Sequence, residues 1–147
     1  MIQRIQSLYL LIAAILVALL FFLPFAEITK DGVIYLFNLK GIFLQGAVFE
    51  NGIPIMSLAG IILVMHFFAI LGYKKRIRQI RLIAYTIIVL MGLFGMFFFV
   101  AYYSYSGEQT SFKISHVFPI VAIILDYLAI RAIRKDEALI RSIDRIR

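Results

Sequence analysis

An uncharged apolar run from Leu82 to Tyr103 limits the fold more than any other feature of the sequence. A helix needs about 20 consecutive apolar residues to cross a hydrocarbon core of about 30 Å. Three further apolar stretches show the same pattern, although His66 interrupts one of them and Asp126 another. We therefore predict an all-α membrane protein, a bundle of four transmembrane helices at about residues 5–25, 53–73, 82–103 and 115–134.

The composition supports this class. The chain of 147 residues is 63% hydrophobic and 16% charged, whereas a soluble domain is about 45–50% apolar and about 25% charged. These values exclude a disordered chain, and the absence of cysteine excludes a disulfide-stapled domain and a cysteine-ligated metal site. The first apolar stretch is too long for a signal-peptide core and no small-x-small cleavage site follows it, so we expect a retained anchor. Residues 1–147 are predicted to form one membrane domain.

The basic residues divide unevenly between the two sides of this arrangement. Twelve of the 15 lysines and arginines fall on the side of both chain ends and of the turn between the second and third spans. Cytoplasmic loops carry the excess of Lys and Arg, so both termini are predicted to be cytoplasmic. We expect contact with anionic lipid headgroups, or with a partner, from Arg4, Lys74, Lys75, Arg76, Arg78, Arg81, Arg134, Lys135, Arg141 and Arg145. Nucleic acid is not an expected partner, because the basic turn has no aromatic side chain for base stacking.

The outer loop, residues 26–52, is the longest connection between spans. Asp31-Gly32 separates two strand-like runs, which indicates a β-hairpin. We predict two or three short strands here, which either cap the helix ends or form a partner-binding surface. The second outer loop, Ser104 to His116, is expected to be short and polar.

The fourth helix is predicted to continue into the cytoplasm as an amphipathic tail over residues 135–147, because no Gly or Pro follows Ile120. Its apolar side chains fall on one helical face: Leu139, Ile140, Ile143 and Ile146. This tail either lies on the inner leaflet or docks to another protein.

Asp126 is the main candidate for a functional residue, because an intramembrane carboxylate is costly and faces the interior of a bundle. Each of the other spans offers polar groups at a similar depth: His66, Tyr85, Thr86 and Tyr9. We predict that Asp126 contacts at least one of them, with His66 the first choice because an imidazole can donate to a carboxylate. The cluster is interpreted either as structural pairing or as a site coupled to transport or a ligand.

Motifs for catalysis are missing from the sequence. It contains no phosphate-binding Gly-rich loop, no Gly-x-Ser-x-Gly elbow and no His-Glu-x-x-His. The two histidines, His66 and His116, lie at different levels of the membrane, which argues against a bis-histidine haem or a histidine-rich metal site. We expect no enzymatic activity, no cofactor and no metal.

The two chain ends carry a family resemblance. The segments concerned are Met1 to Leu11 (MIQRIQSLYLL) and Arg131 to Ser142 (RAIRKDEALIRS). Together they resemble a domain-of-unknown-function family of small bacterial inner-membrane proteins with four predicted spans. The resemblance implies a location in the bacterial inner membrane and a multi-pass topology. It implies no activity, because none is established for the family.

Two functional hypotheses follow. The first is a non-enzymatic accessory or scaffold subunit that binds another protein, in a larger membrane complex, through its cytoplasmic ends. The second is a small transporter that uses Asp126 as a coupling carboxylate. Four spans enclose little volume, so a transport pathway would need a homo-oligomer.

Overall fold

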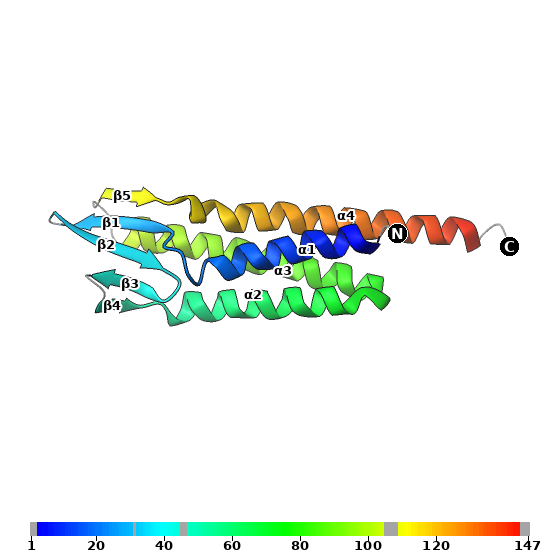
Figure 1. The fold of residues 1–147 in the computed structure, drawn as a ribbon, viewed down its shortest axis with the longest axis horizontal. Coiled ribbons are helices and arrows are strands. Elements are labelled where there is room, and N and C mark those ends of the chain that lie inside the picture. Colours follow the sequence, from blue (N-terminus) through cyan, green and yellow to red (C-terminus); the bar gives the residue numbers. More distant parts are fainter. Residues whose placement is uncertain (1–2, 31, 45–46, 105–108, 145–147) are drawn as a thin grey trace.

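The computed structural model describes residues 3–30, 32–44, 47–104 and 109–144. Four helices lie side by side along the long axis, and a β-sheet extends the molecule at one end (Figure 1). The helices are α1 (Gln3–Leu19), α2 (Ile53–Leu71), α3 (Arg76–Phe98) and α4 (Phe118–Asp144). The start of α1 and the α2–α3 turn lie at the end opposite the sheet, where α4 extends past the other helices.

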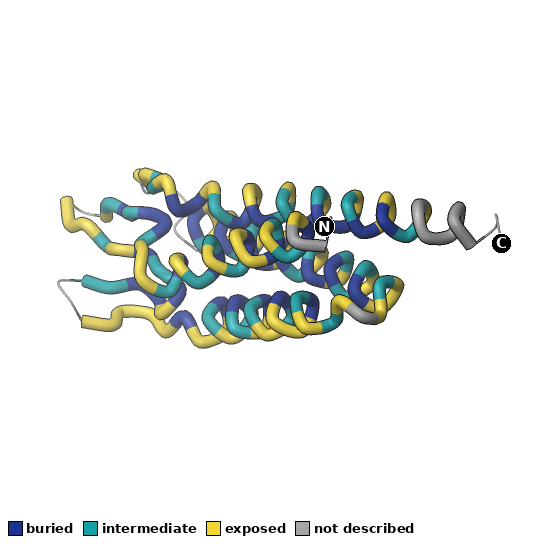
Figure 2. The backbone as a smooth tube through the Cα atoms, turned by 45° about the vertical axis from the view of Figure 1, so that its right-hand side comes forward, coloured by how far each residue is buried: buried dark blue, intermediate teal, exposed yellow. Residues whose placement is uncertain are grey.

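Each long helix packs against two neighbours. α1 and α3 both contact α2 and α4, so α2 and α4 face each other diagonally across the centre. On α2 the buried residues recur every three or four positions, at Ile55, Ala59, Ile62, His66 and Ala69. This spacing places them on one helix face. The outward faces expose large apolar side chains, such as Val64 and Phe67, as expected of helices surrounded by lipid (Figure 2).

Three helical segments of the described chain are long and apolar enough to cross a membrane: Ile53–Leu71, Arg76–Tyr103 and Ile114–Ala138. They match the spans predicted at 53–73, 82–103 and 115–134. The span predicted at 5–25 is only partly helical, because α1 has 17 residues, about 25 Å of helix. A tight turn through Leu20 and Leu23 follows it, held by backbone hydrogen bonds of 3.1–3.2 Å to the last residues of α1.

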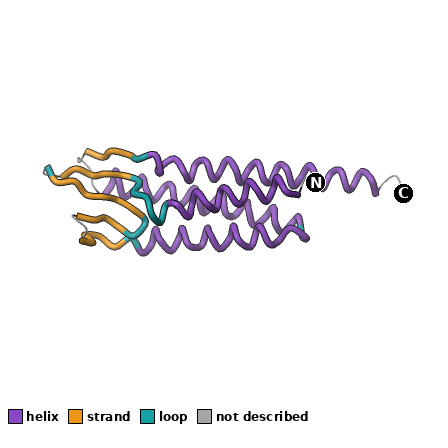
Figure 3. The backbone as a smooth tube through the Cα atoms, viewed as in Figure 1, coloured by secondary structure: helices purple, strands orange, loops and turns teal. Residues whose placement is uncertain are grey.

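The strands of the described residues form a five-stranded antiparallel sheet of order β4-β3-β2-β1-β5 (Figure 3). Its strands are β1 (Ala26–Lys30), β2 (Val33–Asn38), β3 (Gly41–Leu44), β4 (Ala47–Asn51) and β5 (Gln109–Phe112). The predicted all-α class is therefore wrong. The outer loop holds four strands rather than two or three. The second outer loop, expected to be a polar connection, supplies β5, because Ser111 pairs with Glu27 of β1.

Two glycines set the hairpin turns. Gly32 has φ +76°, which favours glycine, and it joins β1 to β2 at the predicted hairpin; Asp31 lies outside the described residues. Gly41 has φ +130° and opens β3. A Cβ atom at Gly41 would lie 2.0 Å from the carbonyl oxygen of Glu50 in β4. The close approach of β4 therefore requires glycine at this position.

The inner face of the sheet closes the helix ends. Phe25, just before β1, stacks on Phe97 of α3 with ring centroids 4.0 Å apart, and it contacts Phe37 of β2 edge-on at 4.3 Å. All three rings are buried. These contacts support the cap interpretation for the inner face. The outer face exposes the apolar side chains of Ile34, Leu36 and Val48.

α4 continues to Asp144 without a break, as predicted for a helical extension. In Figure 1 its last turns stand clear of the other three helices. The side chains of Leu139, Ile140 and Ile143, and Ile146 entirely, lie outside the described part of the chain.

Candidate functional site

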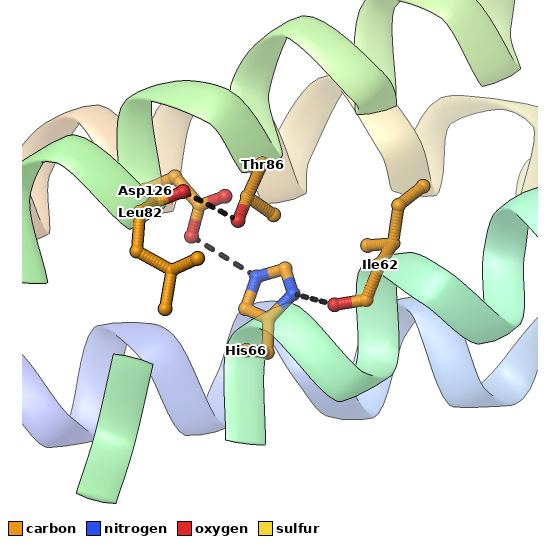
Figure 4. Close-up of polar contacts among 5 residues, drawn as sticks. All are labelled: Ile62, His66, Leu82, Thr86 and Asp126. Carbon is orange, nitrogen blue, oxygen red and sulfur yellow. Dashed lines mark hydrogen bonds and ion pairs between the residues drawn. The ribbon is translucent and has the colours of Figure 1, made fainter. Parts of the chain in front are cut away.

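The centre of the helical part holds a buried polar pair. His66 of α2 and Asp126 of α4 are 1% and 0% exposed, and His66 Nε2 lies 3.1 Å from Asp126 Oδ1 (Figure 4). Because α2 and α4 are diagonal, the two side chains meet at the centre of the four helices. The contact predicted from the sequence is present. Its role in function stays a prediction.

The hydrogen bonds of the imidazole define how many protons the pair holds. His66 Nδ1 lies 3.0 Å from the carbonyl oxygen of Ile62, and a carbonyl only accepts, so Nδ1 carries a hydrogen and donates it. The contact between Nε2 and Oδ1 then holds one further hydrogen, either on the imidazole or on the carboxyl group. In both arrangements the pair has no net charge, which lowers the cost of burying it. Losing that proton leaves one negative charge.

The second carboxylate oxygen of the pair is unsatisfied. Asp126 Oδ2 is buried and has no hydrogen-bond partner among the described residues. Thr86 is buried on α3, but its hydroxyl donates to the carbonyl of Leu82 in the same helix at 2.9 Å (Figure 4). A buried acceptor without a donor is costly, so Asp126 Oδ2 is the atom where an incoming proton or polar ligand would bind.

Two members of the predicted cluster lie elsewhere. Tyr85 lies between Ala84 and Thr86 on α3, and successive residues of a helix are turned by about 100° from one another. Of these three residues only Thr86 is buried, and Tyr85 points outward and is 60% exposed. Tyr9 is half-buried and packs near Leu10 against a second apolar cluster towards the end opposite the sheet. The structure therefore brings together His66 and Asp126, with Thr86 on the adjoining helix.

A second buried polar contact was not predicted. Gln6 of α1 donates from Nε2 to Asp136 Oδ2 of α4 at 2.6 Å, and both residues are 6% exposed. A signal for it exists in the sequence, because Ala129, Ile133 and Asp136 continue the three-to-four spacing that begins at Ala122. The prediction placed residues from 135 onwards in a cytoplasmic amphipathic tail outside the bundle and so left Asp136 out.

A family model matches residues 2–146, almost the whole chain. The chain belongs to the family DUF4293, a domain of unknown function. This confirms the family resemblance of the two chain ends. The family description names neither an activity nor a location. No curated protein and no solved structure matches the chain.

The basic end of this DUF4293 protein lies opposite the sheet. Arg76, one of the predicted headgroup or partner contacts, is half-buried there. Five others have exposed side chains: Lys75, Arg78, Arg81, Arg134 and Lys135. The side chains of Arg4, Lys74 and Arg141, and Arg145 entirely, lie outside the described part of the chain. The sheet end carries Lys30, Lys40 and Lys113. The charge asymmetry of the sequence therefore corresponds to the two ends of the molecule.

Proposed function

We propose that this protein is a four-span protein of the bacterial inner membrane, with both termini in the cytoplasm. In this proposal it is a non-enzymatic accessory or scaffold subunit that binds another protein through its cytoplasmic ends. The observation that carries the proposal is the end of α4, which extends beyond the other helices at the end of the molecule where Arg134 and Lys135 are exposed (Figure 1).

The membrane placement rests on length and surface. Three helices have spanning length, and α1 with the turn through Leu23 gives 21 residues from Gln3, enough for a fourth span. The positive-inside rule then assigns the end that holds Arg78, Arg134 and Lys135 to the cytoplasm. The sheet lies on the opposite side.

The length of unsupported helix favours docking. Gln6 contacts Asp136, and α1 begins at Gln3, only three residues earlier. α4 continues for eight residues after Asp136, about 12 Å of helix. A helix end of this kind is stabilised by packing rather than by propensity alone, and a cytoplasmic partner would supply that packing.

Photo-crosslinking in native membranes tests this function. A photoreactive residue replaces Ala138, which is exposed on the α4 extension, and in a control it replaces Tyr127, which is 60% exposed in the span. We expect one dominant protein adduct from position 138 and none from position 127. Equal adducts from both positions, or adducts with lipid alone, would contradict the accessory role.

The second candidate function is transport that uses Asp126. It is favoured by one observation: Asp126 Oδ2 has no hydrogen-bond partner among the described residues, and the contact of Oδ1 with His66 holds one transferable proton. Proteoliposomes with an internal pH-sensitive dye test it, since Asp126→Asn removes the carboxylate and is expected to abolish any proton flux of the wild type. Growth and uptake that depend on the protein but not on the Asp126 carboxylate would refute this candidate.

A further inference from the structure

A groove runs between α1 and α4 at the end of the helices opposite the sheet. It has a volume of about 370 Å³ and is lined by Ile5, Tyr9, Leu128, Arg131, Ala132 and Lys135. Arg131, Ala132 and Lys135 lie three, four and seven positions after Leu128, so the four α4 residues form one stripe along the helix. Ala132 lies between Arg131 and Lys135 on this stripe and lines the groove with a short side chain.

The charge of the groove is positive and uncompensated. Arg131 and Lys135 are both exposed and lie one helical turn apart, with Cβ atoms about 5–6 Å apart. Neither forms an ion pair with any residue that the structure describes, and none of the described side chains that line the groove is acidic. Like charges at this spacing repel each other, so an anion bound between them relieves the repulsion. The nearby carboxylate of Asp136 is directed instead to Gln6, where it accepts a hydrogen bond.

The polarity of the groove changes along its length. Leu128 lies seven residues before Lys135 on α4, about 10 Å along the helix axis and nearer the middle of the span. The α1 wall is formed by Ile5 and Tyr9, one turn apart. Along α4 the two cations therefore cover the part of the groove from Arg131 to Lys135, and the part towards Leu128, nearer the middle of the span, is apolar. Inorganic phosphate would use only the charged end, whereas a phospholipid would use both.

We propose that this groove is a binding site for an anionic phospholipid, with the headgroup phosphate between Arg131 and Lys135 and an acyl chain along Leu128. The proposal rests on the membrane placement given above. The groove between α2 and α3 is an internal comparison, because it has a similar volume, about 360 Å³, but only one cation, Arg78, among the lining residues that the structure describes.

Native mass spectrometry of the purified full chain in a neutral detergent tests the proposal. The probes are phosphatidylglycerol and phosphatidylcholine with identical acyl chains. We expect one phosphatidylglycerol to bind with clear preference, and the double variant Arg131→Gln/Lys135→Gln to weaken that binding by about tenfold or more. The matched control Lys30→Gln/Lys40→Gln removes the same charge from the sheet end and is expected to leave the binding within about twofold. Equal weakening in both double variants would overturn the site in favour of diffuse attraction.

Two further arms separate a phospholipid from a free anion. Ala132→Leu fills the groove and keeps both cations, so we expect it to weaken phosphatidylglycerol binding as well. Inorganic phosphate is expected not to displace the lipid. Displacement by phosphate, together with unchanged binding in Ala132→Leu, would overturn the lipid assignment. These assays need neither a partner nor a defined topology. If the crosslinks from position 138 are present but no lipid preference is found, the lipid site is refuted and the accessory role is not.

Discussion

Replacing His66 or Asp126 tests whether their contact stabilises the fold. Both side chains are almost fully buried, so water cannot replace a lost partner. In His66→Phe the Asp126 carboxyl stays buried and loses the hydrogen bond with His66, which we expect to cost about 1–3 kcal/mol. In Asp126→Leu the imidazole keeps its bond to the Ile62 carbonyl, so we expect a smaller loss, about 1 kcal/mol.

The double variant His66→Phe/Asp126→Leu tests the pair as a whole, through the sign of its stability difference from His66→Phe. It leaves no unpaired polar group at the centre, and replacement of a buried pair by apolar residues of similar volume is often neutral or stabilising. We therefore expect the double variant to be more stable than His66→Phe alone. Asp126→Asn is the matched control, because its amide nitrogen can donate to Nε2, and it is expected to cost less than about 1 kcal/mol.

Unfolding in mixed micelles of mild detergent and sodium dodecyl sulfate, followed by circular dichroism, measures these free energies. If the two single losses simply add in the double variant, the residues are not coupled and the reasoning fails. A loss in Asp126→Asn as large as that in His66→Phe would also refute it, because the hydrogen bond would then not be the stabilising element.

Two other substitutions test contacts outside the centre. Gly41→Ala places a Cβ atom against the Glu50 carbonyl at positive φ, so we expect a loss of more than about 1 kcal/mol in the same unfolding assay, and an unchanged midpoint would refute the close approach of β4. Gln6→Leu leaves the Asp136 carboxylate without its donor, so we expect a loss of about 1–3 kcal/mol, while Gln6→Glu/Asp136→Gln restores a donor–acceptor pair and should recover most of it.

The helices and their central contact could be predicted because each has a local signal. Runs of about 20 apolar residues define a spanning helix without reference to the rest of the chain. The depth of Asp126 and of His66 follows from counting residues to the nearest basic group at the membrane edge. A carboxylate at that depth has few polar neighbours available, so the pairing was predictable before the helix order was known.

The sheet could be predicted only in part, because strand pairing is a long-range property. The β1–β2 hairpin has the Asp-Gly signal between two strand-like runs. β5 has no such signal, since Gln109–Phe112 is short and mostly polar and becomes a strand only by pairing with β1. The all-α expectation failed for this reason. It included two or three short strands in the outer loop, as a cap or a partner-binding surface, but no strand from the second outer loop to complete a sheet with them.

The two buried polar contacts together define how α4 is placed. Asp126 and Asp136 lie ten residues apart, about 15 Å along the helix, and about 80° apart around it. They accordingly reach two different helices, α2 through His66 and α1 through Gln6. Apolar packing alone distinguishes poorly between neighbouring registers when the surroundings are also apolar, as in lipid. A shift of α4 by one turn, about 5.4 Å, would break both contacts at once and leave two buried carboxyl groups unpaired. These two acids therefore set the axial position and the rotation of the helix that carries the basic end.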